Sequence, residues 1–173
     1  MLAVPRRASV QAMAAELPAA IAWARRHGLT LDHDEDALTL WLALTGPGAE
    51  PDTVEGYLLR GRFDDYRAIA PEWLFVDPET RKEIGADAFP APPGVGAFGA
   101  SLFIQNNSRV LICAHFNRLA YASHGGVHGD WGETTSWLTR RPGQTYATNI
   151  GSMLDRIYRD MAYTRGRRAP VAT

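Results

Sequence analysis

Residues 9–27 begin the chain's regular patterns with apolar side chains at every third or fourth position. This spacing predicts an amphipathic helix that stops near Arg25, Arg26 and Gly28. Pro18 lies inside the pattern and is expected to kink the helix or to start a new one, because proline lacks the backbone N–H. The apolar positions are Val10, Met13, Leu17, Ile21, Trp23 and Ala24.

Four segments with strand-like patterns follow the helix. Residues 29–36 alternate weakly, and residues 37–46, "ALTLWLALTG", are rich in β-forming residues and end at a Gly-Pro-Gly turn. Together these two segments predict a hairpin. The segment "VEGYLLRGRFDDY", residues 54–66, predicts a third strand, and "PEWLFVDP", residues 71–78, predicts a fourth.

The pattern changes after the fourth strand. Residues 79–100 are dense in proline and glycine, which suits a loop or an insertion better than a helix or a central strand. Two short apolar runs in residues 101–116 surround a polar centre and indicate a hairpin or an extended segment. Residues 145–163 carry apolar side chains at helical spacing and predict a second amphipathic helix. A run of strands flanked by helices predicts an α+β fold with an antiparallel sheet.

The composition fits a single globular domain. The chain has 173 residues, of which 46% are hydrophobic and 21% are charged. We assign residues 1–164 to one domain and expect residues 165–173, "RGRRAPVAT", to form a disordered basic tail. The formal net charge of -1 provides no overall basic field, so a nucleic-acid partner is not expected.

Neither a membrane span nor a disulfide is expected. The longest strongly apolar stretch, residues 37–44, is far shorter than the roughly 20 residues that cross a bilayer. The chain has one cysteine, which cannot form an internal disulfide, and its N-terminus lacks the form of a signal peptide. These features predict a protein of the reducing cytoplasm.

The segment "SRVLICAHFNRLAYASHGGVHGDW", residues 108–131, holds that single cysteine, Cys113, and three of the five histidines. A free cysteine is either a buried apolar residue or a reactive nucleophile, and spacing alone leaves both interpretations open. The flanking sequence decides between them.

That flanking sequence resembles the ubiquitin-conjugating (E2) family. The passage "GYLLRGRFDDYRAIAPEWLFVDP" is similar to the family's "F-x-x-x-Y-P-x-x-P-P-x-V-x-F" motif, with Phe63, Tyr66, Pro71 and Phe75 in matching order. The family's "H-P-N-(x)-G-x-I-C" motif matches at its last two residues, Ile112 and Cys113. The His-Pro-Asn triplet is missing, and its asparagine falls on Gln105 by strict counting, or on Asn106 or Asn107 if the turn is shorter.

The resemblance implies a ubiquitin-conjugating fold of N-terminal helix, four-stranded meander sheet, cysteine-bearing segment and C-terminal helix. It also implies that Cys113 accepts a ubiquitin-like modifier as a thioester from an E1-like activating enzyme and passes it to an amine of a protein acceptor. A thiol suits both steps, because its thiolate attacks well and leaves well. No metal or other cofactor is implied. By analogy, the helix over residues 9–27 contacts the activating enzyme through Arg6, Arg7, Arg25 and Arg26.

The 79–100 segment and the histidine-rich stretch are more similar to divergent bacterial E2-like proteins. Such proteins are found beside an activating enzyme and a modifier, in operons some of which act in antiviral defence. Lys82 is the only lysine of the chain. For a protein that carries an activated acyl group, scarce lysine limits self-modification, although the same bias that enriches arginine also explains it.

Acyl transfer needs two kinds of helper beside the thiol. Amide donors stabilise the oxyanion, and Asn106, Asn107 and Asn117 are candidates, although an Asn-Asn pair also favours a turn. A base must take the proton of the incoming amine, and His115, His128 and Asp130 lie close in sequence. His115 would project to the same side as Cys113 if the chain stays extended. We expect Trp131 and Trp137 to be lid or core residues.

Three other interpretations remain open. Cys113, His115, His124 and His128 are zinc-binding residue types, although Gly125 and Gly126 disfavour a shared helix. Cys113 with a histidine and a carboxylate or amide would suit a hydrolase that cleaves a modifier, although the preceding "RVLI" predicts a strand rather than a helix N-terminus. Finally, the domain would be a non-catalytic binding module if Cys113 were incidental.

Overall fold

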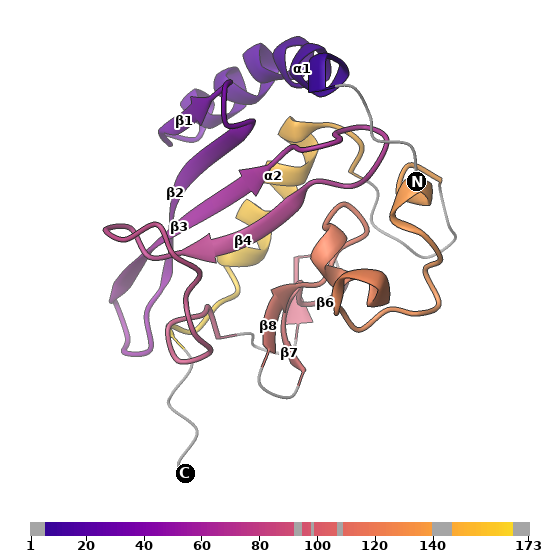
Figure 1. The fold of residues 1–173 in the computed structure, drawn as a ribbon. Coiled ribbons are helices and arrows are strands. Elements are labelled where there is room, and N and C mark those ends of the chain that lie inside the picture. Colours follow the sequence, from indigo (N-terminus) through magenta and orange to yellow (C-terminus); the bar gives the residue numbers. More distant parts are fainter. Residues whose placement is uncertain (1–5, 92–94, 98, 107–108, 140–146, 168–173) are drawn as a thin grey trace.

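The computed structural model describes residues 6–91, 95–97, 99–106, 109–139 and 147–167. It has the predicted α+β architecture, with an N-terminal helix, an antiparallel four-stranded sheet and a C-terminal helix (Figure 1). The helices are α1 (Arg6–Arg26) and α2 (Ile150–Met161), with short 3-10 helices η1 (Arg118–Ala120), η2 (Ala122–His124) and η3 (Thr134–Ser136). The strands are β1 (Leu31–Asp34), β2 (Thr39–Pro47), β3 (Val54–Arg62), β4 (Glu72–Val76), β5 (Val95–Gly96), β6 (Gly99–Ala100), β7 (Phe103–Asn106) and β8 (Arg109–Ile112).

The main sheet is a meander in the order β1-β2-β3-β4, and each strand pairs antiparallel with the next. Leu42 is opposite both Leu31 and Leu59, so alternate residues of the strands share one face. The side chains on that face are buried and form much of the core. They include Leu40, Leu42, Leu44, Tyr57, Leu59, Trp73 and Phe75. The period-two pattern in the sequence therefore identified the sheet correctly.

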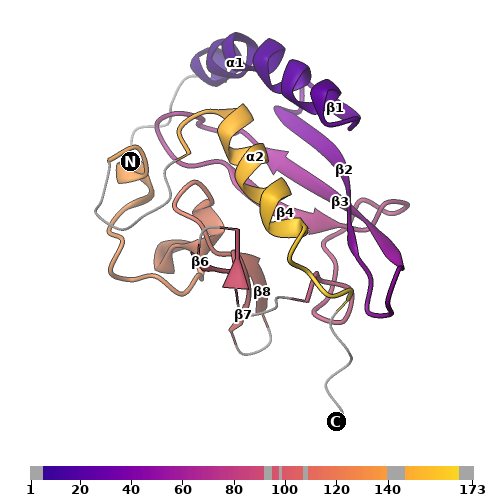
Figure 2. The ribbon, with the colours of Figure 1, turned by 180° about the vertical axis from the view of Figure 1, so that it is seen from behind.

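α2 covers the buried face of this sheet, and α1 lies at the β1 edge, where it packs beside α2 (Figures 1 and 2). α1 continues through Pro18, so the alternative of a fresh helix start at this residue is wrong. Asn149 caps α2 with a capping box to Ser152.

Glu16 connects the helices to the loop after β3. Its Oε2 accepts hydrogen bonds from Tyr66 Oη at 2.7 Å and from the backbone N–H of Ile150 at 2.8 Å. Its other oxygen pairs with Arg67. A carboxylate at the start of α2 also complements the positive end of that helix.

The proline- and glycine-rich segment is anchored to α2 at its C-terminal end. The buried carboxylate of Asp160 accepts the backbone N–H groups of Ala97 at 2.9 Å and Leu102 at 2.7 Å. Arg156 lies 3.1 Å from the same carboxylate and balances its charge. A long irregular segment thus reaches β7 at a fixed position.

The start of the predicted tail is ordered. Gly166 N–H donates to Pro47 O at 2.8 Å, and Ala91 N–H donates to Gly166 O at 2.7 Å. Arg167 contacts Glu55 and stacks over the ring of Tyr57. Residues 165–167 thus make contacts with the rest of the domain, and residues 168–173 of the predicted tail lie outside the described residues. None of the described helices combines the length and the apolar character needed to span a membrane.

Candidate functional site

The β7–β8 hairpin leads directly to Cys113. The two strands pair from Phe103 opposite Ile112 to Asn106 opposite Arg109. Cys113 is the first residue after β8, and its backbone N–H donates to Leu102 O at 2.7 Å. The hairpin lies beside the main sheet, next to β4 (Figure 1). Of the two alternatives that the sequence indicated, a hairpin or an extended segment, the structure has the hairpin.

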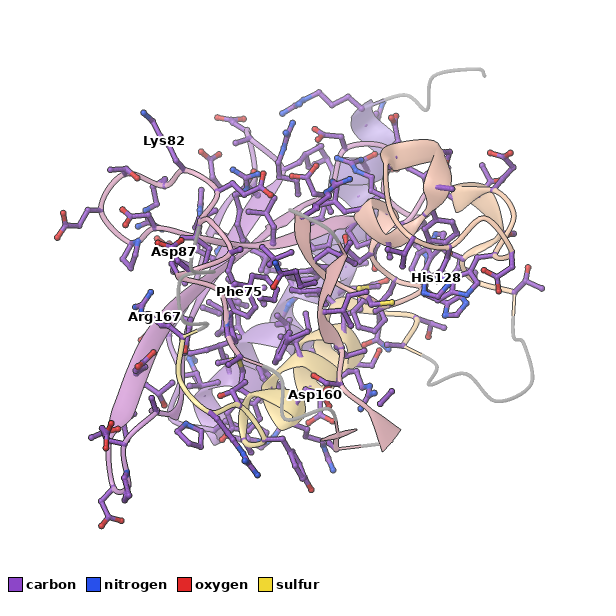
Figure 3. The ribbon with its side chains drawn as sticks, turned by 90° about the horizontal axis from the view of Figure 1, so that it is seen from below. Phe75, Lys82, Asp87, His128, Asp160 and Arg167 are labelled. Atoms are coloured by element: carbon purple, nitrogen blue, oxygen red, sulfur yellow. The ribbon has the colours of Figure 1, made fainter. Side chains whose placement is uncertain are left out.

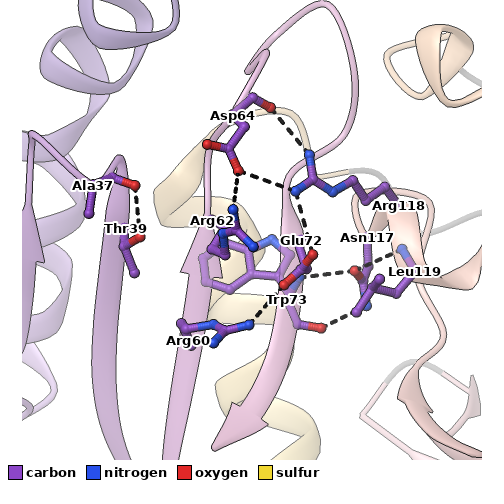
Figure 4. Close-up of polar contacts among 10 residues, drawn as sticks. All are labelled: Ala37, Thr39, Arg60, Arg62, Asp64, Glu72, Trp73, Asn117, Arg118 and Leu119. Carbon is purple, nitrogen blue, oxygen red and sulfur yellow. Dashed lines mark hydrogen bonds and ion pairs between the residues drawn. The ribbon is translucent and has the colours of Figure 1, made fainter. Parts of the chain in front are cut away.

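Asn117 fastens this hairpin to the main sheet. Its Nδ2 group donates to Ile112 O at 2.8 Å and to Trp73 O at 3.0 Å, so both of its N–H bonds are used. Its Oδ1 accepts the N–H groups of Trp73 at 3.0 Å and Leu119 at 3.3 Å (Figure 4). Asn117 is fully buried, and this set of hydrogen bonds is called the Asn117 clasp below. Because both N–H bonds of the Asn117 amide are used in the clasp, this amide does not serve as an oxyanion donor.

Arg118 adds an ionic connection beside the clasp. Its guanidinium lies 3.5 Å from carboxylate oxygens of both Asp64 and Glu72, and it is almost fully buried (Figure 4). Arg60 pairs with Glu72 at 2.9 Å from the neighbouring strand. Charges with low exposure need such paired partners, and here they fix η1 against the start of β4.

The loop after η1 brings His128 back to the cysteine. The backbone N–H of His128 donates to Ala120 O, and the backbone N–H of Ala122 donates to His128 O, both at 3.1 Å. Gly126 makes the close turn possible, because a Cβ at this residue would lie 2.1 Å from the backbone of Ala120. His128 Nε2 consequently lies 2.9 Å from Cys113 Sγ.

Asp130 completes a chain of three side chains. Its Oδ1 lies 3.3 Å from His128 Nδ1, on the side of the imidazole opposite the thiol. A proton on Nδ1 facing the carboxylate leaves Nε2 as the acceptor for the thiol proton. The side chain of His128 is 27% exposed and that of Asp130 is 78% exposed, so the chain runs from the interior to the surface.

The environment of Cys113 favours the neutral thiol. Burial, followed by the negative charge of Asp130, raises the pKa of Cys113 from its ordinary value to about 11. At neutral pH the thiol is therefore protonated in the resting protein. Nucleophilic attack requires a base that takes this proton, and His128 is at hydrogen-bond distance to do so.

His115 does not contact the cysteine as the sequence suggested. The chain turns after Cys113, and the ring of His115 stacks on Trp131, with 3.7 Å between ring centroids. His128 stacks on the same indole at 3.5 Å. Two nearly parallel rings at such distances from one indole cannot share a face, so Trp131 lies between the two histidines. The condition for placing His115 on the side of Cys113, an extended backbone after β8, is therefore not met.

No contact with the thiol is found for the other candidate residues that the structure describes. Asn106 pairs with Arg109 at the tip of the hairpin, three residue pairs from Ile112, which is about 10 Å along the strands. Asn107 lies outside the described residues. His124 belongs to the exposed η2, and burial followed by the charge of Arg118 lowers its pKa. Trp137 is a core residue whose Nε1 donates to Arg67 O.

The zinc interpretation finds no support in the part of the chain that the structure describes. Cys113, His115, His124 and His128 are all described, and no three His, Cys, Asp or Glu side chains there form a group that could hold a metal ion. The indole of Trp131 separates His115 from His128. The stacking role of Trp131 could not be predicted from the sequence, because no spacing rule signals it.

No protein-family model and no curated protein matches the chain. Function must therefore be argued from the geometry of the site.

Proposed function

We propose that this protein is a ubiquitin-conjugating (E2)-like acyl carrier, in which Cys113 accepts a ubiquitin-like modifier as a thioester and transfers it to an amine. The observation that carries the proposal is the 2.9 Å contact between Cys113 Sγ and His128 Nε2, at the end of a hairpin beside a four-stranded meander. The order of helix, meander, cysteine and helix supports it, because the family resemblance in the sequence has the same order.

The reaction would proceed in two exchanges. Cys113 Sγ attacks the thioester carbonyl carbon of the modifier on the activating enzyme, and His128 Nε2 takes the thiol proton. The activating enzyme's cysteine leaves as a thiolate and receives a proton. In the second step an acceptor amine attacks the new thioester, His128 takes its proton, and the Cys113 thiolate leaves and is reprotonated.

A hydrolase is the second candidate, and the Cys113–His128–Asp130 chain is the observation that favours it. This order of nucleophile, imidazole and carboxylate activates cysteine and serine nucleophiles in unrelated hydrolases. A hydrolase would use water in the second step, where a carrier uses an amine. The two candidates therefore share the acyl-enzyme intermediate and differ in its lifetime in water.

Charging of Cys113 is the decisive experiment. The protein would be incubated with its neighbouring activating enzyme, the modifier and ATP, and analysed on reducing and non-reducing gels. We expect an adduct that thiols remove, that Cys113→Ala abolishes and that is discharged faster by added lysine than by water. Release of the modifier without an accumulated adduct would favour the hydrolase, and no reaction with a demonstrably active activating enzyme would favour a binding module.

The partners follow from the same proposal. They are an E1-like activating enzyme, a ubiquitin-like modifier and a protein acceptor, in a reducing cytoplasm and as part of a bacterial antiviral conjugation system. Four arginines are exposed at the two ends of α1 and offer a cationic contact for the activating enzyme. They are Arg6, Arg7, Arg25 and Arg26.

Reversal of these charges tests the α1 contact. Changing Arg25 and Arg26 to Glu should slow charging at least about threefold without unfolding the protein, because exposed charges mainly steer association. The rate would be measured at low and high salt. Equal charging rates for the wild type and the variant would discard this contact.

A further inference from the structure

We propose that Trp131 is a positioning residue for His128, and that His115 holds the indole of Trp131 from its other face. The planes of His128 and Trp131 differ by only 5°, and those of His115 and Trp131 by 22°. The result is a three-ring stack in the order His128, Trp131, His115. This inference rests on the proposed function for the reaction it serves, but its test requires no modifier.

The stack joins two segments that meet only in the folded chain. His115 lies in the turn after β8, whereas His128 and Trp131 lie on the returning loop. Tyr121 closes the stack at its edge, with its ring 5.4 Å from that of Trp131 and nearly perpendicular to it. Its hydroxyl donates to His115 O at 2.9 Å, and its backbone forms a bridge with His128. Trp131 is 8% exposed, so the indole has little freedom to move.

His128 needs such a support because its two hydrogen-bond partners act only in the plane of its ring. Nε2 must face Cys113 Sγ while Nδ1 faces Asp130, and both contacts are lost if the ring plane rotates. Asp130 is an exposed side chain and holds the ring only weakly. The flat face of Trp131 adds a second restraint on the ring plane to the one that the two hydrogen bonds provide. Ring orientation is what a general base at this distance requires.

The stack also favours the product of proton transfer. When His128 takes the thiol proton it becomes an imidazolium, and the electron-rich face of an indole attracts a cation. The gain is present only in the charged form, so it shifts the thiol–imidazole pair toward thiolate and imidazolium. A packing residue without a π face would fill the same space but would not supply this preference.

The test is the rate at which iodoacetamide alkylates the protein as a function of pH. In this reaction the thiolate sulfur attacks the carbon of iodoacetamide and iodide leaves. Cys113 is the only cysteine, so the rate reports this thiolate alone. Trp131→Leu should lower the rate at pH 7 by about threefold to tenfold and move the midpoint of the profile to higher pH. Trp131→Phe, which keeps a smaller aromatic face, should lie between Leu and the wild type.

A second pair of variants separates the stack from the proton chemistry of His115. His115→Leu should move the profile in the same direction as Trp131→Leu, by a smaller amount. His115→Phe should recover most of the loss, because a phenyl ring stacks without titrating. The titratable side chains that contact the His128 ring within the described residues are Cys113 and Asp130, and both are present in all four variants.

The proposal is overturned if Trp131→Leu and His115→Leu are folded, as judged by thermal denaturation, and give the wild-type pH profile. It is equally overturned if they lower the rate by the same factor at every pH, because a loss of packing alone has that effect. His128→Gln provides the reference for a thiol without its base. Failure of charging with a normal alkylation profile would reject the proposed function and leave this inference standing.

Discussion

Cys113 is held in its neutral form by its surroundings, and this has a consequence for stability. Its pKa is raised, first by burial and then by the charge of Asp130, from 9.0 to about 11. Below pH 9 the thiol is protonated in the folded and unfolded chains alike. Between pH 9 and 11 the unfolded chain loses the proton while the folded chain keeps it, so rising pH favours unfolding.

Urea unfolding of the wild type and of Cys113→Ala at several values of pH measures this loss in the free energy of unfolding. The wild type should lose about 2 kcal/mol more than the variant between pH 9 and 11, since partial exposure reduces the full effect of the shift. The raised pKa values of Tyr57 and Tyr66 act equally in both proteins. Parallel stability curves above pH 9 would contradict the assigned environment of the thiol.

The sequence named the three candidate residues that the structure brings together, but not their arrangement. Cys113, His128 and Asp130 were all candidates, because their residue types suit acyl transfer. Proximity in sequence favoured His115, whereas the turn after β8 and the close approach at Gly126 bring His128 to the thiol. These are tertiary effects that residue spacing does not encode.

At the scale of elements, the Asn117 clasp determines where the cysteine lies relative to the sheet. Its four hydrogen bonds connect the end of β8 with the start of β4 and with η1. β8 is not part of the main sheet. The side chain of Asn117 therefore supplies the hydrogen bonds between β8 and β4 that strand pairing would otherwise provide. Loss of one amide should therefore affect both stability and reactivity.

Two substitutions test the clasp. Asn117→Ala leaves buried backbone groups without partners and should lower the free energy of unfolding by about 2–4 kcal/mol. Asn117→Asp directs a carboxylate at two carbonyl oxygens, so its stability should fall further as pH rises from 4 to 8, when the acid loses the proton that it can donate. Urea unfolding at both pH values measures this. A pH-independent Asn117→Asp variant would show that the amide donors are not needed.

The elements themselves were largely predictable. Alternation and helical spacing predicted the meander and both helices, because each of these elements buries one face against the core. The tail was not predictable, since the contacts of Arg165–Arg167 are made with residues far away in the sequence. Asn117 was a candidate oxyanion donor because the sequence does not show which groups an asparagine side chain bonds to in the folded protein.

For the whole molecule, the position of the single lysine matters. Lys82 is exposed in the turn after β4, and Figure 3 places it and His128 on opposite sides of the molecule. A thioester on Cys113 is therefore out of reach of this amine in the same molecule. If the protein is a carrier, its charged form is protected from internal discharge onto Lys82.

Lys82→Arg should accordingly leave the lifetime of the charged protein unchanged. The lifetime would be followed on non-reducing gels after ATP is removed, at several protein concentrations. An adduct at Lys82 that resists thiols and forms at a rate independent of concentration would contradict the arrangement. Formation proportional to concentration would indicate transfer between molecules and would be compatible with it.

The Asn117 clasp also divides the molecule into parts that form early and late in folding. The sheet pairs nearby residues, such as Pro47 with Val54, whereas Asn117 bonds to Trp73 across 44 residues and Glu16 bonds to Ile150 across 134. Closing long loops costs more entropy, so the clasp should form after the meander, and Asn117→Ala should speed unfolding more than it slows refolding. A newly made chain should therefore form its meander before the clasp fixes the position of Cys113, and the native reactivity of the thiol should appear only in that later step.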